Sequence, residues 1–206
     1  MTDWNQVTWT VARAGGMTAY VLVTASVVLG LALSMRWQRP NWPRLITNEL
    51  HSFVTLLSLV FLTVHVGAVW IDPYLNFRWN EVFVPLASTY RPVWTALGIV
   101  ALYLLLAVRI STQVRPWIGQ AWWRRLHGLS FAVFALSTVH GMTAGSDART
   151  PWATAIYCAA LLLVGGLLQL RLLTPIGTRG RTYPTLAAGA LVFTLGCVGW
   201  TLSAPL

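Results

Sequence analysis

The four histidines of this chain form two pairs, and each pair lies inside one strongly apolar stretch. His51 and His65 are fourteen residues apart, and His127 and His140 are thirteen apart. If both stretches are helical, a rise of about 1.5 Å per residue separates the members of each pair by roughly 20 Å. Ionisable side chains within membrane-spanning segments are by default candidates for a functional site. Because imidazole is an axial ligand of haem iron, this spacing predicts two haems at two depths.

The composition indicates which kind of protein holds these histidines. The chain has 206 residues, of which 56% are hydrophobic and 9% are charged, and its mean hydropathy is +0.64. Soluble domains carry far more charge, so we expect an integral membrane protein in contact with lipid. The net charge of +9 comes from arginines that lie mostly between the apolar stretches. This distribution is typical of membrane topology signals and does not indicate nucleic-acid binding.

Six apolar stretches are about long enough to cross a bilayer, which takes roughly 20 helical residues. They cover residues 14–35, 46–70, 92–112, 123–145, 152–173 and 184–203. The expected fold is therefore an all-α, polytopic membrane helical bundle, with residues 1–206 forming a single membrane domain. Met35 and Arg36 follow the first stretch where a signal peptide would have a small-residue cleavage site, so we expect this span to be retained.

The arginines also predict the orientation of the bundle, because cytoplasmic loops of membrane proteins are enriched in basic residues. Arginines gather in the first, third and fifth connections: Arg36, Arg39 and Arg44; Arg115, Arg124 and Arg125; Arg171, Arg179 and Arg181. We therefore place both termini outside a bacterial cytoplasmic membrane. This orientation puts His51 and His127 at the inner depth and His65 and His140 at the outer depth. It predicts one haem between each of these two pairs, both between the second and fourth helices.

Helix geometry raises one difficulty for this arrangement. At about 100° per residue, thirteen residues leave His127 and His140 roughly 140° apart around an ideal helix. We expect this helix to depart from ideal winding, for example by a π-type bulge, or to present the two histidines from different sides. Gly128 and Gly141, each directly after a histidine, ease this or let a porphyrin approach the backbone. Zinc is not expected, because ligands 20 Å apart on one helix cannot converge on one ion.

Haem carboxylates need cationic partners near the membrane interfaces, and the planar guanidinium of arginine suits them. The candidate haem contacts are Arg44, Arg124 and Arg125 for the inner haem and Arg13, Arg78 and Arg91 for the outer one. For each of them, a role in topology alone stays open. The spans contain almost no carboxylate apart from Glu49, so we do not expect a proton relay.

Other prominent residues are expected to serve structure. Cys158 and Cys197 lie in separate apolar stretches without CxxC spacing, which is typical of packing residues. The tryptophans cluster near the predicted span ends, where indole rings anchor helices at the headgroups. The segment from Asp72 to Arg91 mixes aromatic and charged residues and is expected to cap the outer site.

The pattern His51-x13-His65 followed by His127-x12-His140 resembles the ferric-reductase-like transmembrane domain shared by NADPH oxidases and ferric reductases. The stretches ELHSFVTLLSLVFLTVHV and WRRLHGLSFAVFALSTVHG carry the resemblance. It covers about residues 12–173 and leaves an extra helix within 174–206. It implies two non-covalent b-type haems, in line with the absence of a CxxCH motif, and electron flow from the inner haem to the outer one.

Oxidases and reductases of that family carry a flavin and nicotinamide domain after the fifth core span. This chain has a short arginine-rich connection there, and no GxGxxG turn between a strand and a helix. It therefore resembles the stand-alone bacterial members, which work with separate partners.

We accordingly expect an oxidoreductase component, not self-sufficient as an enzyme, that carries electrons from the cytoplasmic to the outer face. Its donor would be a flavoprotein, a quinol or another redox protein, and the sequence does not define its acceptor. Two alternatives stay open. One is a non-catalytic haem-binding subunit of a larger membrane complex. The other is a transporter or channel, which would have water-accessible histidines and broken helices.

Overall fold

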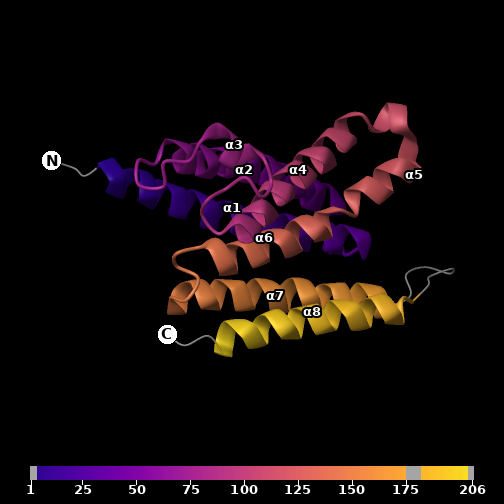
Figure 1. Ribbon diagram of the computed structural model, residues 1–206. Helices are drawn as coiled ribbons and strands as arrows, with labels where there is room; N and C mark the ends of the chain where they lie inside the picture. The colour runs from indigo at the N-terminus through magenta and orange to yellow at the C-terminus, as the bar shows by residue number, and fades with distance from the viewer. Residues whose placement is uncertain (1–3, 175–181, 204–206) are drawn as a thin grey trace. The chain divides into compact units, whose positions relative to one another are not determined.

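The computed structural model describes residues 4–174 and 182–203, and this part of the chain is helical apart from its connections (Figure 1). Arg39 and Trp42 form an isolated β-bridge in the first connection. Arg179 and Arg181, which contribute to the predicted orientation, lie outside the described residues. The helices are α1 (Trp4–Ser34), α2 (Arg44–Ile71), α3 (Trp79–Phe83), α4 (Pro92–Gln113), α5 (Arg115–His127), α6 (Ser130–Ala144), α7 (Pro151–Leu173) and α8 (Pro184–Ser203).

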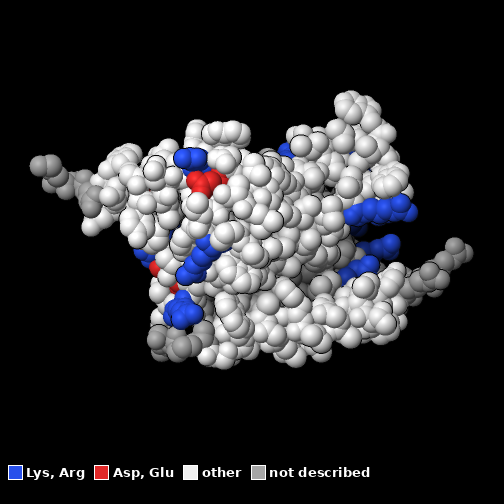
Figure 2. All heavy atoms as spheres, viewed as in Figure 1, with Lys and Arg blue, Asp and Glu red and all other residues white. Residues whose placement is uncertain are grey.

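Among the helices that the structure describes, five are long and apolar enough to cross a membrane, namely α1, α2, α4, α7 and α8. They confirm the expected all-α membrane protein. Their outward faces carry large apolar side chains such as Phe53, Leu162 and Val192, all of which are exposed. Lipid rather than water is the natural neighbour of such surfaces. On the face shown in Figure 2, charged side chains gather near the ends of helices and leave their central parts uncharged.

The fourth expected span, residues 123–145, is divided between two helices. α5 ends at His127 and α6 begins at Ser130. Between them the amide of Leu129 donates to the carbonyl of Leu126 at 3.0 Å, and the amide of Phe131 donates to that of Gly128 at 3.3 Å. These i to i−3 bonds form a tight 3₁₀-type turn, which advances more than 100° per residue. The expected departure from ideal winding is present, but it is a tightened turn and not a π bulge.

The extra rotation of this turn brings the predicted ligands of the fourth span closer to one face. It also leaves α6 with 15 residues, or about 22 Å at 1.5 Å per residue. That length is less than the roughly 30 Å of a bilayer core, so α6 does not reach the length of the five apolar helices.

The described helices group into two compact units, each built from separate stretches of chain. Unit 1 comprises Met1–Tyr20 and Val60–Ser146, and unit 2 comprises Val21–Leu59 and Asp147–Leu206. α1 and α2 are each continuous helices, and each contributes one half to either unit.

In unit 1, α4 packs along α6. The ring of Tyr20 from α1 stacks on Phe134 with 6.1 Å between centroids. The Tyr20 hydroxyl also lies 3.1 Å from that of Thr138, which is fully buried. These contacts fix the first half of α1 against α6 within this unit.

In unit 2, α7 packs along α8. The Cys158 sulfur lies 3.2 Å from the Thr201 hydroxyl, and the amide of Gln169 donates to the carbonyl of Ala187 at 2.7 Å. A Cβ at Gly165 would lie 2.5 Å from the hydroxyl oxygen of Thr194, so these helices meet closely at a small residue. Cys158 therefore occupies a packing position, as expected.

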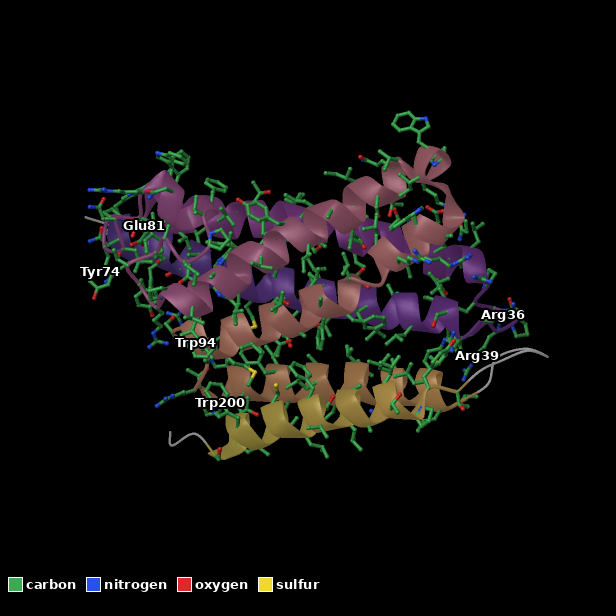
Figure 3. The ribbon with its side chains drawn as sticks, turned by 45° about the vertical axis from the view of Figure 1, so that its right-hand side comes forward. Arg36, Arg39, Tyr74, Glu81, Trp94 and Trp200 are labelled. Carbon is green, nitrogen blue, oxygen red and sulfur yellow. The ribbon has the colours of Figure 1, made fainter. Side chains whose placement is uncertain are left out.

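Two carboxylates order the connection between α2 and α4. Asp72 is 2% exposed and accepts hydrogen bonds from the Thr8 hydroxyl at 2.8 Å and from two amides at 3.0 Å. Glu81, labelled in Figure 3, accepts from the amides of Arg78 and Thr89, both at 2.9 Å. These backbone bonds, that of Arg78 first, lower the pKa of Glu81. The connection is thus held by hydrogen bonds to two carboxylates.

Candidate haem-binding site

His65 on α2 is tethered to the backbone of α1. Its Nδ1 lies 2.7 Å from the carbonyl oxygen of Ala12. Because a carbonyl oxygen only accepts hydrogen bonds, Nδ1 is the donor, and the neutral ring carries its lone pair on Nε2. Nε2 is therefore the atom that can bind a metal.

His140 on α6 has the same arrangement with α4. Its Nδ1 lies 2.8 Å from the carbonyl oxygen of Trp94, in the first turn of α4 (Figure 3). The same reasoning places the lone pair on Nε2. His65, held by α1, and His140, held by α4, thus both carry the lone pair on Nε2.

His65 and His140 both belong to unit 1 of the structure. Within the described residues, no three His, Cys, Asp or Glu side chains gather as a metal-binding group. Two imidazoles alone suit the axial positions of a haem better than the four-ligand shell of zinc.

His51, on the half of α2 in unit 2, repeats the tether. Its Nδ1 lies 2.9 Å from the carbonyl oxygen of Ser26 and 3.2 Å from the Ser26 hydroxyl. That hydroxyl also lies 2.7 Å from the hydroxyl of Thr55, which donates to the His51 carbonyl at 2.7 Å. A short polar network on two helices therefore fixes this ring in the same tautomer.

His127 is held by a different kind of contact. It is the last residue of α5, and its ring stacks on Trp123, one turn earlier, with 4.9 Å between centroids. The guanidinium of Arg115 lies 4.6 Å from the centroid of the same indole. The indole nitrogen of Trp123 donates to the Thr112 hydroxyl at 3.3 Å. An aromatic stack on its own helix thus orients this ring.

Of the six predicted haem-contacting arginines, Arg91 has the clearest place. Its guanidinium donates to the carbonyl of Thr143, three residues after His140, and it lies 5.4 Å from the ring centroid of Tyr90. Arg13 directly follows Ala12 in the sequence and lies 5.9 Å from the ring centroid of Trp9. Arg13 and Arg91 therefore belong to the turns that hold His65 and His140.

The other four predicted arginines lie at helix ends. Arg44 is the first residue of α2, and Arg78 is the N-cap of α3. Arg124 and Arg125 belong to the last turn of α5, where Arg125 lies 5.0 Å from the ring centroid of Trp122. All four side chains are exposed. A role for them in binding haem stays a prediction.

The sequence reasoning missed the carbonyl acceptors, because a backbone group has no side-chain signature. One signal was present: Ala12 and Ser26 are fourteen residues apart, as are His51 and His65. Because α1 and α2 run in opposite directions, these equal spacings let Ala12 meet His65 and Ser26 meet His51. Comparison of the chain with models of known protein families, with curated proteins and with solved structures found no match.

Proposed function

We propose that this chain conducts electrons across a membrane through two b-type haems. The outer haem would be held by His65 and His140, and the inner haem by His51 and His127. Electrons would enter at the cytoplasmic face and leave at the outer face. In this proposal α5 and α6 together form the fourth of six membrane segments, and both termini lie outside a bacterial cytoplasmic membrane.

The observation that carries the proposal is the tether shared by three of the four histidines. Each donates from Nδ1 to a carbonyl on a neighbouring helix and keeps the lone pair on Nε2. Hydrogen bonding of the second ring nitrogen is the usual way in which proteins orient metal-binding histidines. The same tautomer thus recurs at three separate places, each through a different backbone carbonyl.

The chain's own residues would orient and tune the cofactor. A bis-histidine haem, when bound, supplies one-electron exchange with no open coordination position. The backbone carbonyls of Ala12, Ser26 and Trp94 make the rings more basic, which favours ferric over ferrous iron. Arg13 and Arg91 are placed in the turns that hold the outer pair, and their cationic groups suit carboxylates. The assignment of the inner pair rests on the sequence spacing.

The proposal requires separate partners. The chain shows no nicotinamide-binding turn, so a flavoprotein, a quinol or another redox protein would deliver electrons. Membrane lipid would surround the apolar helices, and the acceptor would meet the chain at the outer face. Assembly into a larger membrane complex fits the same picture.

The first experiment is a reduced-minus-oxidised absorbance spectrum of the purified full chain, with the haem content per polypeptide. We expect two low-spin b-type haems in the wild type. His65→Ala should remove the outer haem and leave the inner one. A protein without haem, after expression with an ample haem supply, would refute the proposal.

A haem that serves structure alone is the competing function, and kinetics separates the two. A conduit in vesicles should pass electrons from an enclosed reductant to an external ferric chelate. A structural haem would be reduced too slowly to support that flux, and the rate would then be the same in vesicles without protein.

A further inference from the structure

Each tethered histidine lies over a glycine of the helix that accepts its hydrogen bond. That glycine follows the accepting residue by four positions in all three cases. The acceptor and glycine pairs are Ala12 with Gly16, Ser26 with Gly30, and Trp94 with Gly98. We call each pair a histidine cradle.

The four-residue interval has a geometric cause. In an α-helix the Cβ of residue i+4 tilts toward the N-terminus and lies over the turn that contains the carbonyl of residue i. A side chain at i+4 therefore covers that carbonyl, and glycine exposes it. The carbonyl can then accept from an imidazole in addition to its helical partner.

The distances show how closely two of the rings lie. A Cβ built on Gly98 would be 2.8 Å from both Nδ1 and Cε1 of His140 and 2.9 Å from its Nε2. A Cβ on Gly16 would be 2.8 Å from Nδ1 and 3.0 Å from Cε1 of His65. At Gly30 the nearest atom of His51 would be 3.5 Å away, which is ordinary van der Waals contact. Any side chain at Gly98 or Gly16 would displace the ring, whereas Gly30 leaves room for a methyl group.

We infer that Gly98 and Gly16 are positioning residues that set the orientation of His140 and His65. The haem readout below rests on the proposed function, but the packing readout does not. A Cβ on Gly67, two residues after His65, would meet nothing within 4 Å, so a methyl group there touches neither ring. Gly67 is therefore the matched control, in the same unit and one helical turn or less from a ligand.

The decisive experiment is a double-mutant cycle between Gly98 and His140 in the purified full chain. Thermal unfolding is measured for the wild type, Gly98→Ala, His140→Ala and the double variant. We expect Gly98→Ala to lower the Tm in the wild-type background and to have little effect once the ring is absent. Equal losses in both backgrounds would show that the glycine does not act through the ring, and would overturn the inference.

The double-mutant cycle also tests the inference if the single variant fails to fold. If Gly98→Ala yields no folded protein, the double variant should restore folding, because the added methyl group then meets no ring. Failure of the double variant, where His140→Ala alone folds, would overturn the inference. Gly67→Ala should retain the wild-type Tm throughout.

Haem ligation supplies the second readout. If the wild type binds two haems, Gly98→Ala and Gly16→Ala should each open one coordination position at the outer haem. Carbon monoxide then binds the reduced protein and changes its spectrum, whereas Gly67→Ala should not respond. Carbon monoxide binding equal to the wild type in both Gly98→Ala and Gly16→Ala would overturn the inference. If the wild type binds no haem, the proposed function is refuted, and the inference is then tested by the double-mutant cycle alone.

Discussion

The two histidines of the α5–α6 segment are fixed in contrasting ways. The ring of His140 is held by another helix, through the carbonyl of Trp94 and the surface of Gly98. The ring of His127 is held by its own helix, through the stack on Trp123. The carbonyl of Trp94 selects one tautomer of the His140 ring, whereas the stack sets the plane of the His127 ring without selecting a tautomer.

The segments around the two histidines differ in the same way. At the His140 end, Arg91 donates to the carbonyl of Thr143 and so ties the start of α4 to the end of α6. At the other end, Gly119 has a φ of 78° and interrupts the helical geometry of α5. The contact at the His140 end thus joins two helices, whereas the stack of His127 on Trp123 lies within one short helix.

The largest expected effect comes from removing the ligands themselves. His140→Ala should remove the outer haem and His127→Ala the inner one, so that each variant keeps one of the two proposed haems. Redox titration of each variant should then show one midpoint potential in place of two. Loss of both haems in either variant would show that the two sites are not independent.

The next effect tests the tie at the outer end. Arg91→Ala should lower the free energy of unfolding by about 1–2 kcal/mol, because it removes a charge-assisted hydrogen bond from a partly solvated position. Arg91 has a φ of 45°, a left-handed conformation that favours glycine. Arg91→Gly should therefore be about 1 kcal/mol more stable than Arg91→Ala. Equal stabilities, measured by chemical denaturation, would show that the strain is relaxed in the variants.

A smaller effect is expected for the aromatic stack at the inner end. Trp123→Ala should destabilise by roughly 0.5–1.5 kcal/mol beyond the lost buried area, because the stack on His127 is removed. Trp123→Phe retains a stacking surface and should keep most of the stability that Trp123→Ala loses. Trp122→Ala is the control, since Trp122 is exposed and its contact is with Arg125. If Trp122→Ala and Trp123→Ala broaden the inner haem spectrum equally, the stack does not orient His127.

The smallest expected effect is a dependence on pH in the connection at the outer end. The pKa of Glu81 is lowered by its bonds to the amides of Arg78 and Thr89, so its ionised form is favoured in the folded chain. This stabilisation is complete above the ordinary pKa of 4.5 and is lost as the pH falls through the lowered value. Hydrogen exchange at the Thr89 amide should therefore become faster, relative to its intrinsic rate, as the pH falls through the lowered pKa of Glu81. Glu81→Gln should show weak protection at every pH.

Sequence patterns predicted the features that depend on side-chain type. The apolar runs placed α2, α4, α7 and α8 close to their observed bounds, because a membrane helix needs an uninterrupted apolar stretch. The start of α1 was wrong: the helix begins at Trp4, whereas its apolar run was predicted from residue 14. The break after His127 was not located, because Gly128 and Gly141 each follow a histidine in the same way, and only Gly128 lies at a helix end while Gly141 lies inside α6. The 140° discrepancy showed that a distortion was needed but not its kind.

The same limit applies to the candidate site. All four histidines could be singled out as ligands from their depth and spacing, and that assignment stays a prediction. Their hydrogen bonds could not be predicted, because the acceptors are the carbonyls of Ala12, Ser26 and Trp94, and every residue has a carbonyl. The glycines four residues after these acceptors could have been recognised in the sequence. Gly16 and Gly30 repeat the spacing of His51 and His65, and a search for matched spacings on separate helices would have found them.

The continuity of α1 has a consequence for which genetic changes the chain tolerates. Gly16 and Gly30 lie on one unbroken helix, fourteen residues apart, which is nearly four complete turns. Substitutions between them leave the rotation and the distance between the two cradles along α1 unchanged. An insertion of one residue would turn one cradle by about 100° relative to the other and shift it by about 1.5 Å. We therefore expect the interval between these glycines to accept many changes of residue type but no change of length.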